Sequence, residues 1–119
     1  MSQELNYNHL TSVTPIDGRY HQKTQELRSY FSEYAFIRYR LIVEIEYLIA
    51  LSKIDLVETL EEEEVLFLKN IYQKFGVSDA ESVKEIESKI KHDVKSIEYY
   101  IKMKINENSK LEEKGMSIF

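Results

Sequence analysis

Hydrophobic side chains recur every three or four positions along most of this chain, which is the spacing of α-helices that bury one face. The longest such stretch predicts a helix over 32–53, and Ser32 stands where an N-cap hydroxyl belongs. Three more helices are predicted, starting near Thr59, Ser78 and Val94. The apolar stripes are, in chain order, Ile37, Leu41, Ile45, Leu48 and Ile49; Val65, Leu68, Ile71, Tyr72 and Phe75; Val83, Ile86 and Ile90; and Val94, Ile97, Ile101 and Ile105. No sustained apolar–polar alternation predicts a strand, so the predicted fold class is all-α.

Polar residues near the predicted helix ends support these boundaries. Thr59 with Glu62, and Ser78 with Glu81, have the spacing of a capping box, which satisfies free backbone N–H groups of a first turn. Gly76 is the predicted stop of the helix that starts near Thr59, because glycine is common just past a helix C-terminus.

Four consecutive glutamates, 61–64, open the second predicted helix. An acidic run can serve as a metal site or bind a basic partner. Negative charge in a first turn also suits the positive end of the helix dipole. We interpret the run as a solvated first turn.

The start of the chain has a different character. Residues 1–13 predict an irregular arm and 14–119 a helical domain, in which TQELRSYF (24–31) predicts a short helix. The chain holds one proline and three glycines, yet Pro15 and Gly18 lie within four residues of each other. Proline presets one φ angle and glycine is free to take a positive φ, so TPIDGRY predicts a stiff turn.

Composition excludes several classes of protein. The 119 residues hold 16 Lys+Arg against 21 Asp+Glu, and this net charge of −5 argues against general binding to nucleic acid or to an anionic membrane. The absence of cysteine excludes disulfides, thiolate nucleophiles and cysteine-based zinc sites. No secretory signal is visible, and charged residues interrupt the most apolar stretch. We expect a cytoplasmic protein without a metal site, and the net charge does not exclude a small local anion site.

Arg19 and Tyr20 directly follow the predicted turn, which can hold both side chains on a stiff backbone. Arginine offers a planar fork of donors for phosphate or carboxylate, and tyrosine offers a hydroxyl and a stacking face. The alternative is structural: Arg19 pairs with an acid of the chain and Tyr20 packs on the core.

His92 and Asp93 lie between two predicted helices. A histidine at such a corner can donate to a phosphate or move protons near neutral pH, with Asp93 as N-cap of the next helix. The alternative is a surface or capping histidine. His9 and His21 show no metal-ligand spacing with His92 and receive no role.

TPIDGRY, followed by LRSYFSEYAFIRYRLIVEIEYL and much later by SDAESVKEIESKIKHDVKSIEYYIKMKI, resembles the N-terminal domain of the adenylosuccinate lyases, in the fumarase/aspartase superfamily. The resemblance covers about residues 11–112. It implies a helical lyase domain that stops before the central helical bundle of the family. Members are homotetramers that eliminate fumarate from adenylosuccinate, giving AMP, and from the succinylated carboxamide ribotide of purine synthesis. The family uses a base and an acid, with no cofactor and no metal.

The resemblance also implies roles for individual residues. Arg19 and Tyr20 match the pair that contacts the substrate nucleotide, including its phosphate. His92 and Asp93 match a pair beside the substrate, where the histidine positions the substrate and supports the proton-donating histidine. Lys91 stands where the family usually has Asn, and it could add charge for a phosphate. The guanidinium of Arg19 and the imidazole of His92 are then expected to share one pocket wall.

By the same resemblance, the family's Thr-Ser pair, general-acid histidine and catalytic-serine loop come after the position that corresponds to Phe119. The chain then holds no complete catalytic set, and we expect it to be inactive in isolation. One alternative is a non-catalytic helical interaction module derived from the lyase, which docks through the apolar end Met116–Phe119. A second is another superfamily lyase, acting on argininosuccinate or aspartate.

Overall fold

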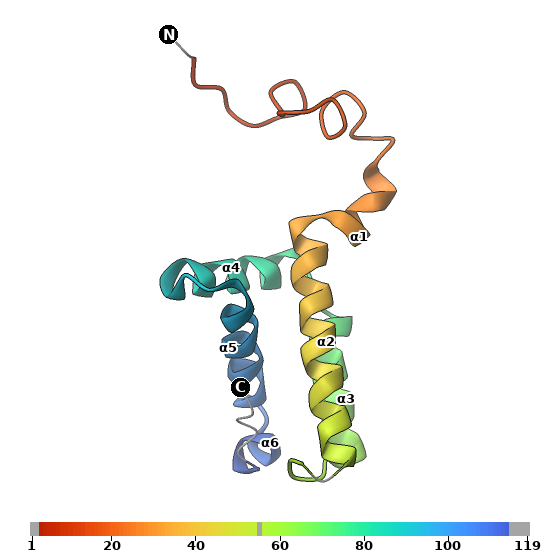
Figure 1. Ribbon diagram of the computed structural model, residues 1–119, viewed down its shortest axis with the longest axis vertical. Coiled ribbons are helices and arrows are strands. Elements are labelled where there is room, and N and C mark those ends of the chain that lie inside the picture. Colours follow the sequence, from red (N-terminus) through yellow and green to blue (C-terminus); the bar gives the residue numbers. More distant parts are fainter. Residues whose placement is uncertain (1–2, 55, 115–119) are drawn as a thin grey trace. The chain divides into compact units, whose positions relative to one another are not determined.

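The structure, a computed structural model, describes residues 3–54 and 56–114 (Figure 1). The chain divides into two compact units, Met1–Ala35 and Phe36–Phe119. In the first unit an irregular segment leads into the 3-10 turn η1 (Gln25–Leu27) and the short helix α1 (Arg28–Phe31). The remaining helices are α2 (Glu33–Lys53), α3 (Glu62–Gln73), α4 (Val77–Ile90), α5 (Asp93–Ile105) and α6 (Ser109–Glu113). No described residue forms a strand, which confirms the all-α prediction.

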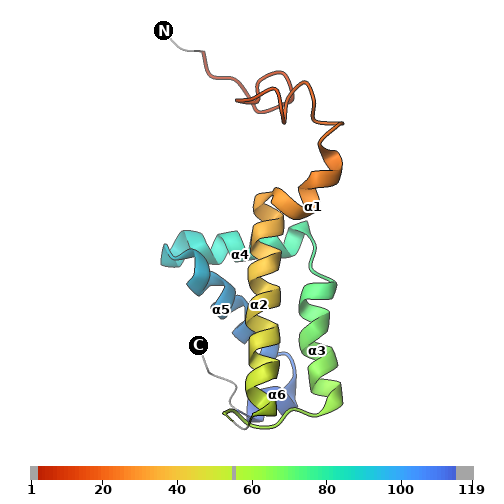
Figure 2. The ribbon, with the colours of Figure 1, turned by 45° about the vertical axis from the view of Figure 1, so that its right-hand side comes forward.

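Helix α2 supplies much of the core of the second unit. Its five predicted stripe residues, Ile37, Leu41, Ile45, Leu48 and Ile49, are all buried. The predicted N-cap is confirmed, because the Ser32 hydroxyl accepts a hydrogen bond from the Ala35 N–H at 3.1 Å. Helices α2 and α3 run side by side, and α4 crosses α2 near its N-terminal end (Figures 1 and 2).

Polar contacts fasten α3 to α2. The Tyr72 hydroxyl donates to Glu46 at 2.5 Å, and the Arg38 Nε donates to the Tyr72 carbonyl at 3.1 Å. Burial and then the Glu46 carboxylate raise the pKa of Tyr72 to about 12, so this hydroxyl keeps its proton and remains a donor at neutral pH.

Both predicted capping boxes are wrong by two residues. Helix α3 starts after Glu61, whose N–H donates to the carboxylate of Glu64 at 3.0 Å. Helix α4 starts after Gly76, whose N–H donates to Asp79 at 2.8 Å. Gly76 is therefore not the stop of the preceding helix, which already ends at Gln73.

The interpretation of the glutamate run as solvated is wrong for its last member. Glu64 is buried, and its carboxylate forms an ion pair with Lys114 at 2.5 Å. Burial alone would raise the pKa of Glu64, but the hydrogen bonds from Lys114 and from the Glu61 N–H outweigh it and leave that pKa lowered. Lys114 also donates to the Thr59 carbonyl at 2.8 Å, so this pair joins the end of α6 to the start of α3.

The stripes of α4 and α5 are only partly buried. Val83 is in the core, whereas Ile90 and Val94, at the α4–α5 corner, are more than one third exposed. Tyr100 is buried and its hydroxyl donates to Asp79 at 3.3 Å, which ties α5 to the start of α4. No helix formed by residues 3–54 and 56–114 is both long and apolar enough to cross a membrane.

Candidate functional site

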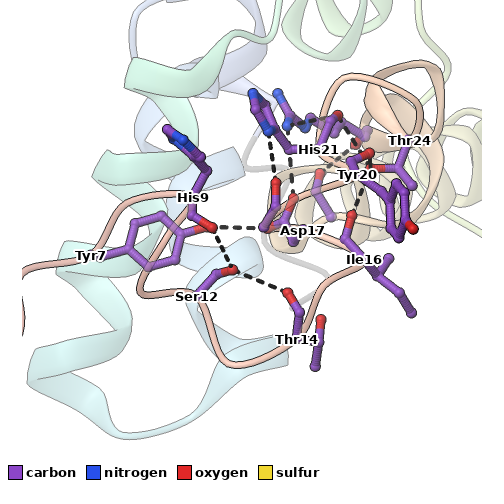
Figure 3. Close-up of polar contacts among 12 residues, drawn as sticks. Tyr7, His9, Ser12, Thr14, Ile16, Asp17, Tyr20, His21 and Thr24 are labelled. Carbon is purple, nitrogen blue, oxygen red and sulfur yellow. Dashed lines mark hydrogen bonds and ion pairs between the residues drawn. The ribbon is translucent and has the colours of Figure 1, made fainter.

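The TPIDGRY segment forms consecutive hydrogen-bonded turns, and the residues before it hold these turns in place (Figure 3). The Gly18 N–H donates to the Thr14 carbonyl at 3.1 Å, and the Tyr20 N–H donates to the Pro15 carbonyl at 2.9 Å. The Ser12 hydroxyl donates to the Thr14 carbonyl at 3.1 Å. The hydrogen bonds of Gly18 and Tyr20 therefore fix the backbone at these two residues and at Arg19 between them.

Gly18 is required here by space and not by its φ angle. The sequence predicts that glycine serves this turn through a positive φ, but the φ of Gly18 lies outside the left-handed region. A Cβ at this position would instead lie 2.7 Å from the His9 carbonyl oxygen and would overlap the Ser12 hydroxyl. Only glycine lets these segments approach so closely.

Arg19 and Tyr20 are presented at the surface of this turn. The Arg19 guanidinium lies over the Tyr20 ring, 4.6 Å from its centroid, and Tyr20 is 41% exposed. Tyr20 is therefore not buried within the first unit. The neighbouring acid, Asp17, pairs with Arg28 at 3.7 Å instead of with Arg19. Within the described part of the chain no ion pair engages the Arg19 fork.

The N-cap of α5 is His92, and the prediction of Asp93 as N-cap is wrong. The Nδ1 of His92 accepts a hydrogen bond from the Lys95 N–H at 3.1 Å. An accepting Nδ1 places the proton of the neutral ring on Nε2. The side chain is 61% exposed, so His92 caps the helix with one nitrogen and offers an N–H donor with the other.

Asp93 is held by contacts within the protein. Its carboxylate accepts from the Val94 N–H at 2.8 Å and pairs with Arg40 of α2 at 3.1 Å. The Val94 N–H and the Arg40 guanidinium lower the pKa of Asp93 below its ordinary value. Arg40 is the residue that sequence reasoning missed. The sequence signal for Arg40 was a cation within an otherwise apolar helical stretch. Its ion pair with Asp93 fixes the start of α5 and hence the position of His92.

Lys91 is the C-cap of α4 and has a left-handed backbone, with φ 59° and ψ 32°. It is the single non-glycine residue with positive φ among the described residues. This conformation is unfavourable for a side chain with a Cβ, and asparagine and glycine tolerate it better. The family preference for Asn at this position, implied by the resemblance, thus has a backbone reason in this structure.

We expect Lys91→Gly to stabilise the protein by about 0.5–1 kcal/mol, because glycine removes the strain of the positive φ. The midpoint of urea unfolding, followed by circular dichroism, measures this change. Lys89→Gly, in the last turn of α4, is the matched control, and it should destabilise by about 1 kcal/mol. A Lys91→Gly protein that is less stable than the parent would contradict the strain argument.

The structure places the predicted site residues on two units. Arg19 and Tyr20 belong to the first unit, and Lys91, His92 and Asp93 lie together at the α4–α5 corner of the second. The shared pocket wall of Arg19 and His92 stays a prediction. Among the described residues, no group of three or more His, Asp or Glu side chains is placed to hold a metal ion.

Comparison with known proteins decides the relationship. The chain is 44% identical over 110 residues to the adenylosuccinate lyase of Buchnera aphidicola subsp. Schizaphis graminum, covering 90% of this chain and 24% of that protein. This chain is a relative of the adenylosuccinate lyases. It is also 46% identical over 106 residues to the enzyme of Dictyostelium discoideum, and 44% identical over 105 residues to that of Legionella pneumophila strain Corby. Each of these matches covers 86% of this chain and 23% of the relative.

The adenylosuccinate lyase resemblance stated from TPIDGRY and KHDVKSIEYY is thereby confirmed, as is the helical lyase fold class. The chain spans about a quarter of the length of the curated adenylosuccinate lyases that it matches. No protein-family model matches the sequence. The apolar end Met116–Phe119, to which the sequence assigns docking, lies outside the described residues.

Proposed function

We propose that this chain forms the N-terminal, substrate-binding part of an adenylosuccinate lyase, which eliminates fumarate from adenylosuccinate and from the succinylated carboxamide ribotide in purine synthesis. The observation that carries the proposal is the similarity over 86–90% of the chain to proteins of that name. The same names favour the purine enzyme over lyases that act on argininosuccinate or aspartate. A cytoplasmic homotetramer, as in the family, is part of the proposal.

In this function Arg19 binds the phosphate of the substrate nucleotide. The guanidinium is stacked on Tyr20, and no ion pair within the described residues competes for its fork. A bidentate fork matches two phosphate oxygens, and such charge-assisted hydrogen bonds are the stronger ones in proteins. The Gly18 turn removes the entropy cost of ordering the backbone that presents these two side chains.

His92 has a supporting part. Its exposed Nε2–H donates to an anionic oxygen of the substrate or to a neighbouring histidine, while the Nδ1 contact with the Lys95 N–H fixes the ring. Asp93 contributes through Arg40, which holds the corner in place. Lys91 adds a positive charge beside the ring. The elimination removes a proton next to a carboxylate and protonates the departing nitrogen. We assign neither proton transfer to these 119 residues, so the isolated chain should not release fumarate.

A chimera tests this proposal. The matching 105-residue region of the Legionella pneumophila enzyme is replaced by the corresponding region of this chain. We expect the chimera to cleave adenylosuccinate, followed by absorbance, while the isolated chain does not. A chimera that assembles as the parent enzyme does, by sedimentation, but has no activity would contradict the proposed function.

In the same chimera we expect Arg19→Lys to raise KM for adenylosuccinate about tenfold with little change in kcat. Lysine keeps the charge but loses the bidentate fork, which costs about 1.4 kcal/mol of binding. Steady-state kinetics measure the change. Lys53→Gln, which removes an exposed cation from the end of α2, is the control and should leave KM unchanged. Equal KM values for Arg19→Lys and the parent would show that Arg19 does not bind the substrate.

An interaction module remains a second candidate, because an apolar groove runs between α2 and α5. The groove has a volume of about 310 Å³, and its α2 side is formed by Phe36, Tyr39, Arg40, Val43 and Glu44. Val43 is 65% exposed there. Two antiparallel copies of α2 would bury this apolar face against each other, which is the self-complementary contact that a two-fold dimer needs. The occupant in this candidate is therefore a second copy of the chain.

Sedimentation of the isolated chain distinguishes this candidate. A dimer that Val43→Asp dissociates, and that Val77→Asp on exposed α4 does not, would support the module. A monomer at all concentrations would exclude self-association through the groove.

A further inference from the structure

A hollow of about 690 Å³ lies beside the Arg19 turn, within the first unit. Its polar and charged lining comes from His9, Ser12, Thr14, Arg19, His21 and Gln22. The whole chain holds 21 acidic residues, but none of the described residues that line this hollow is Asp or Glu. A hollow lined by three basic side chains in an acidic protein favours an anionic ligand.

Two of these side chains, His9 and His21, form a close pair. Their ring centroids are 5.3 Å apart and their planes are inclined by 31°. The Nδ1 of His21 lies 2.7 Å from the Gly18 carbonyl oxygen, which can only accept, so Nδ1 carries a proton. The Nε2 on the other side of that ring becomes a second donor when the ring is protonated. Two protonated rings this close repel each other unless an anion lies between or beside them.

The nearest carboxylate, Asp17, is already engaged. It accepts from the Tyr7 hydroxyl at 3.2 Å and pairs with Arg28 at 3.7 Å (Figure 3). The hydrogen bond to Asp17, followed by its charge, raises the pKa of Tyr7, so that hydroxyl stays a donor. Asp17 borders a second, smaller hollow that both histidines also line, where Arg28 offsets its charge and Tyr7 donates a hydrogen bond to it. The charged groups around the pair are therefore Arg19, Asp17 and Arg28.

We propose that His9 and His21, together with Arg19, bind the phosphate group of a phosphate monoester. The imidazole rings offer N–H donors to the oxygens of a dianion, and the Arg19 fork adds charge-assisted donors beside them. This inference rests on the proposed function, because it names the side chains that complete the grip of Arg19 on the substrate phosphate.

Isothermal titration calorimetry of the full chain with inorganic phosphate and with AMP, at pH 6, tests the inference. The variants are His9→Gln, His21→Gln and Arg19→Lys, with Lys53→Gln at the exposed end of α2 as the control for a charge lost outside the hollow. Each variant is compared with the parent at the same pH. We expect each histidine variant to bind both ligands about tenfold more weakly than the parent. The control should stay within about twofold.

His9→Gln is the decisive variant, because no hydrogen bond within the described residues depends on the His9 ring. Unchanged binding of both ligands by His9→Gln and His21→Gln at pH 6 would overturn the inference, as would a parent chain that binds neither ligand. AMP binding that depends on Arg19 but not on the histidines would overturn it and leave the proposed function standing. Histidine-dependent binding of inorganic phosphate without any binding of AMP would support the hollow and count against the proposed function.

Discussion

Replacing Gly18 by alanine is expected to open the turn that carries Arg19 and Tyr20. The new Cβ would lie 2.7 Å from the His9 carbonyl oxygen, which is backbone and cannot rotate away. The segments must separate, at a cost of about 2 kcal/mol or more. The Gly18 and Tyr20 N–H groups, bonded to the Thr14 and Pro15 carbonyls, would then exchange with solvent roughly 30-fold faster, which hydrogen exchange by NMR measures.

Gly76→Ala is the matched control for this substitution. A Cβ at Gly76 meets only the Asp79 carboxylate, at an ordinary 3.7 Å. Its effect should stay within the modest cost of alanine at an N-cap, about 1 kcal/mol or less. In the chimera, Gly18→Ala should also raise KM at least as much as Arg19→Lys, because it displaces the fork and its backbone together. Unchanged exchange at Tyr20 would show that the close approach at Gly18 does not fix the turn.

Glu64→Ala is expected to destabilise the second unit by about 3 kcal/mol. The substitution breaks an ion pair whose carboxylate is buried and removes the acceptor for the Glu61 N–H. The cost lies at the lower end of the usual range for buried pairs, because Lys114 is 18% exposed and can turn toward water. Urea unfolding followed by circular dichroism measures the loss. Glu63→Ala is the control, since its side chain is 83% exposed and the ammonium group of Lys110 is 3.9 Å away. Equal losses in both variants would contradict a role for burial.

The contribution of Glu64 should also depend on pH with a definite sign. The folded protein lowers the pKa of Glu64 below its ordinary value of 4.5. The stabilisation by the ionised carboxylate is therefore complete above about pH 4.5 and is lost as the pH falls through the lowered folded-state pKa. The stability difference between the parent and Glu64→Gln, from urea unfolding at several pH values, should be constant from pH 5 to 7 and shrink in acid. A difference that grows in acid would contradict the lowered pKa.

The periodic apolar positions predicted the helices well, and the polar signals predicted their ends less well. Ile37 to Ile49 repeat with a period that only a helix buries on one side, and α2 follows it. Thr59 and Ser78 fit a capping pattern as well as Glu61 and Gly76 do by spacing alone. Which pair caps the helix depended on where the chain enters from the preceding loop, and on contacts such as Tyr100 with Asp79 that join distant residues.

The sequence predicted where the site residues stand in the fold, but it assigned some of them the wrong structural role. Arg19 and Tyr20 were predicted after a turn, and the structure presents both at its surface. His92 rather than Asp93 caps α5, and the Asp93 carboxylate instead pairs with Arg40 on another helix. A partner so far away along the chain cannot be read from local spacing. The shared pocket wall of Arg19 and His92 remains a prediction.

By itself, the sequence determined the all-α class, the long core helix and the relationship to the adenylosuccinate lyases, because these depend on local periodicity and on short motifs. The tertiary structure decided which glutamate of 61–64 is buried, why residue 18 is glycine, and which residue caps α5. Each of these depends on an atom brought close by folding: the Lys114 ammonium, the His9 carbonyl and the Arg40 guanidinium. Burial and close approach are properties of the packed chain, so they become visible only when distant segments meet.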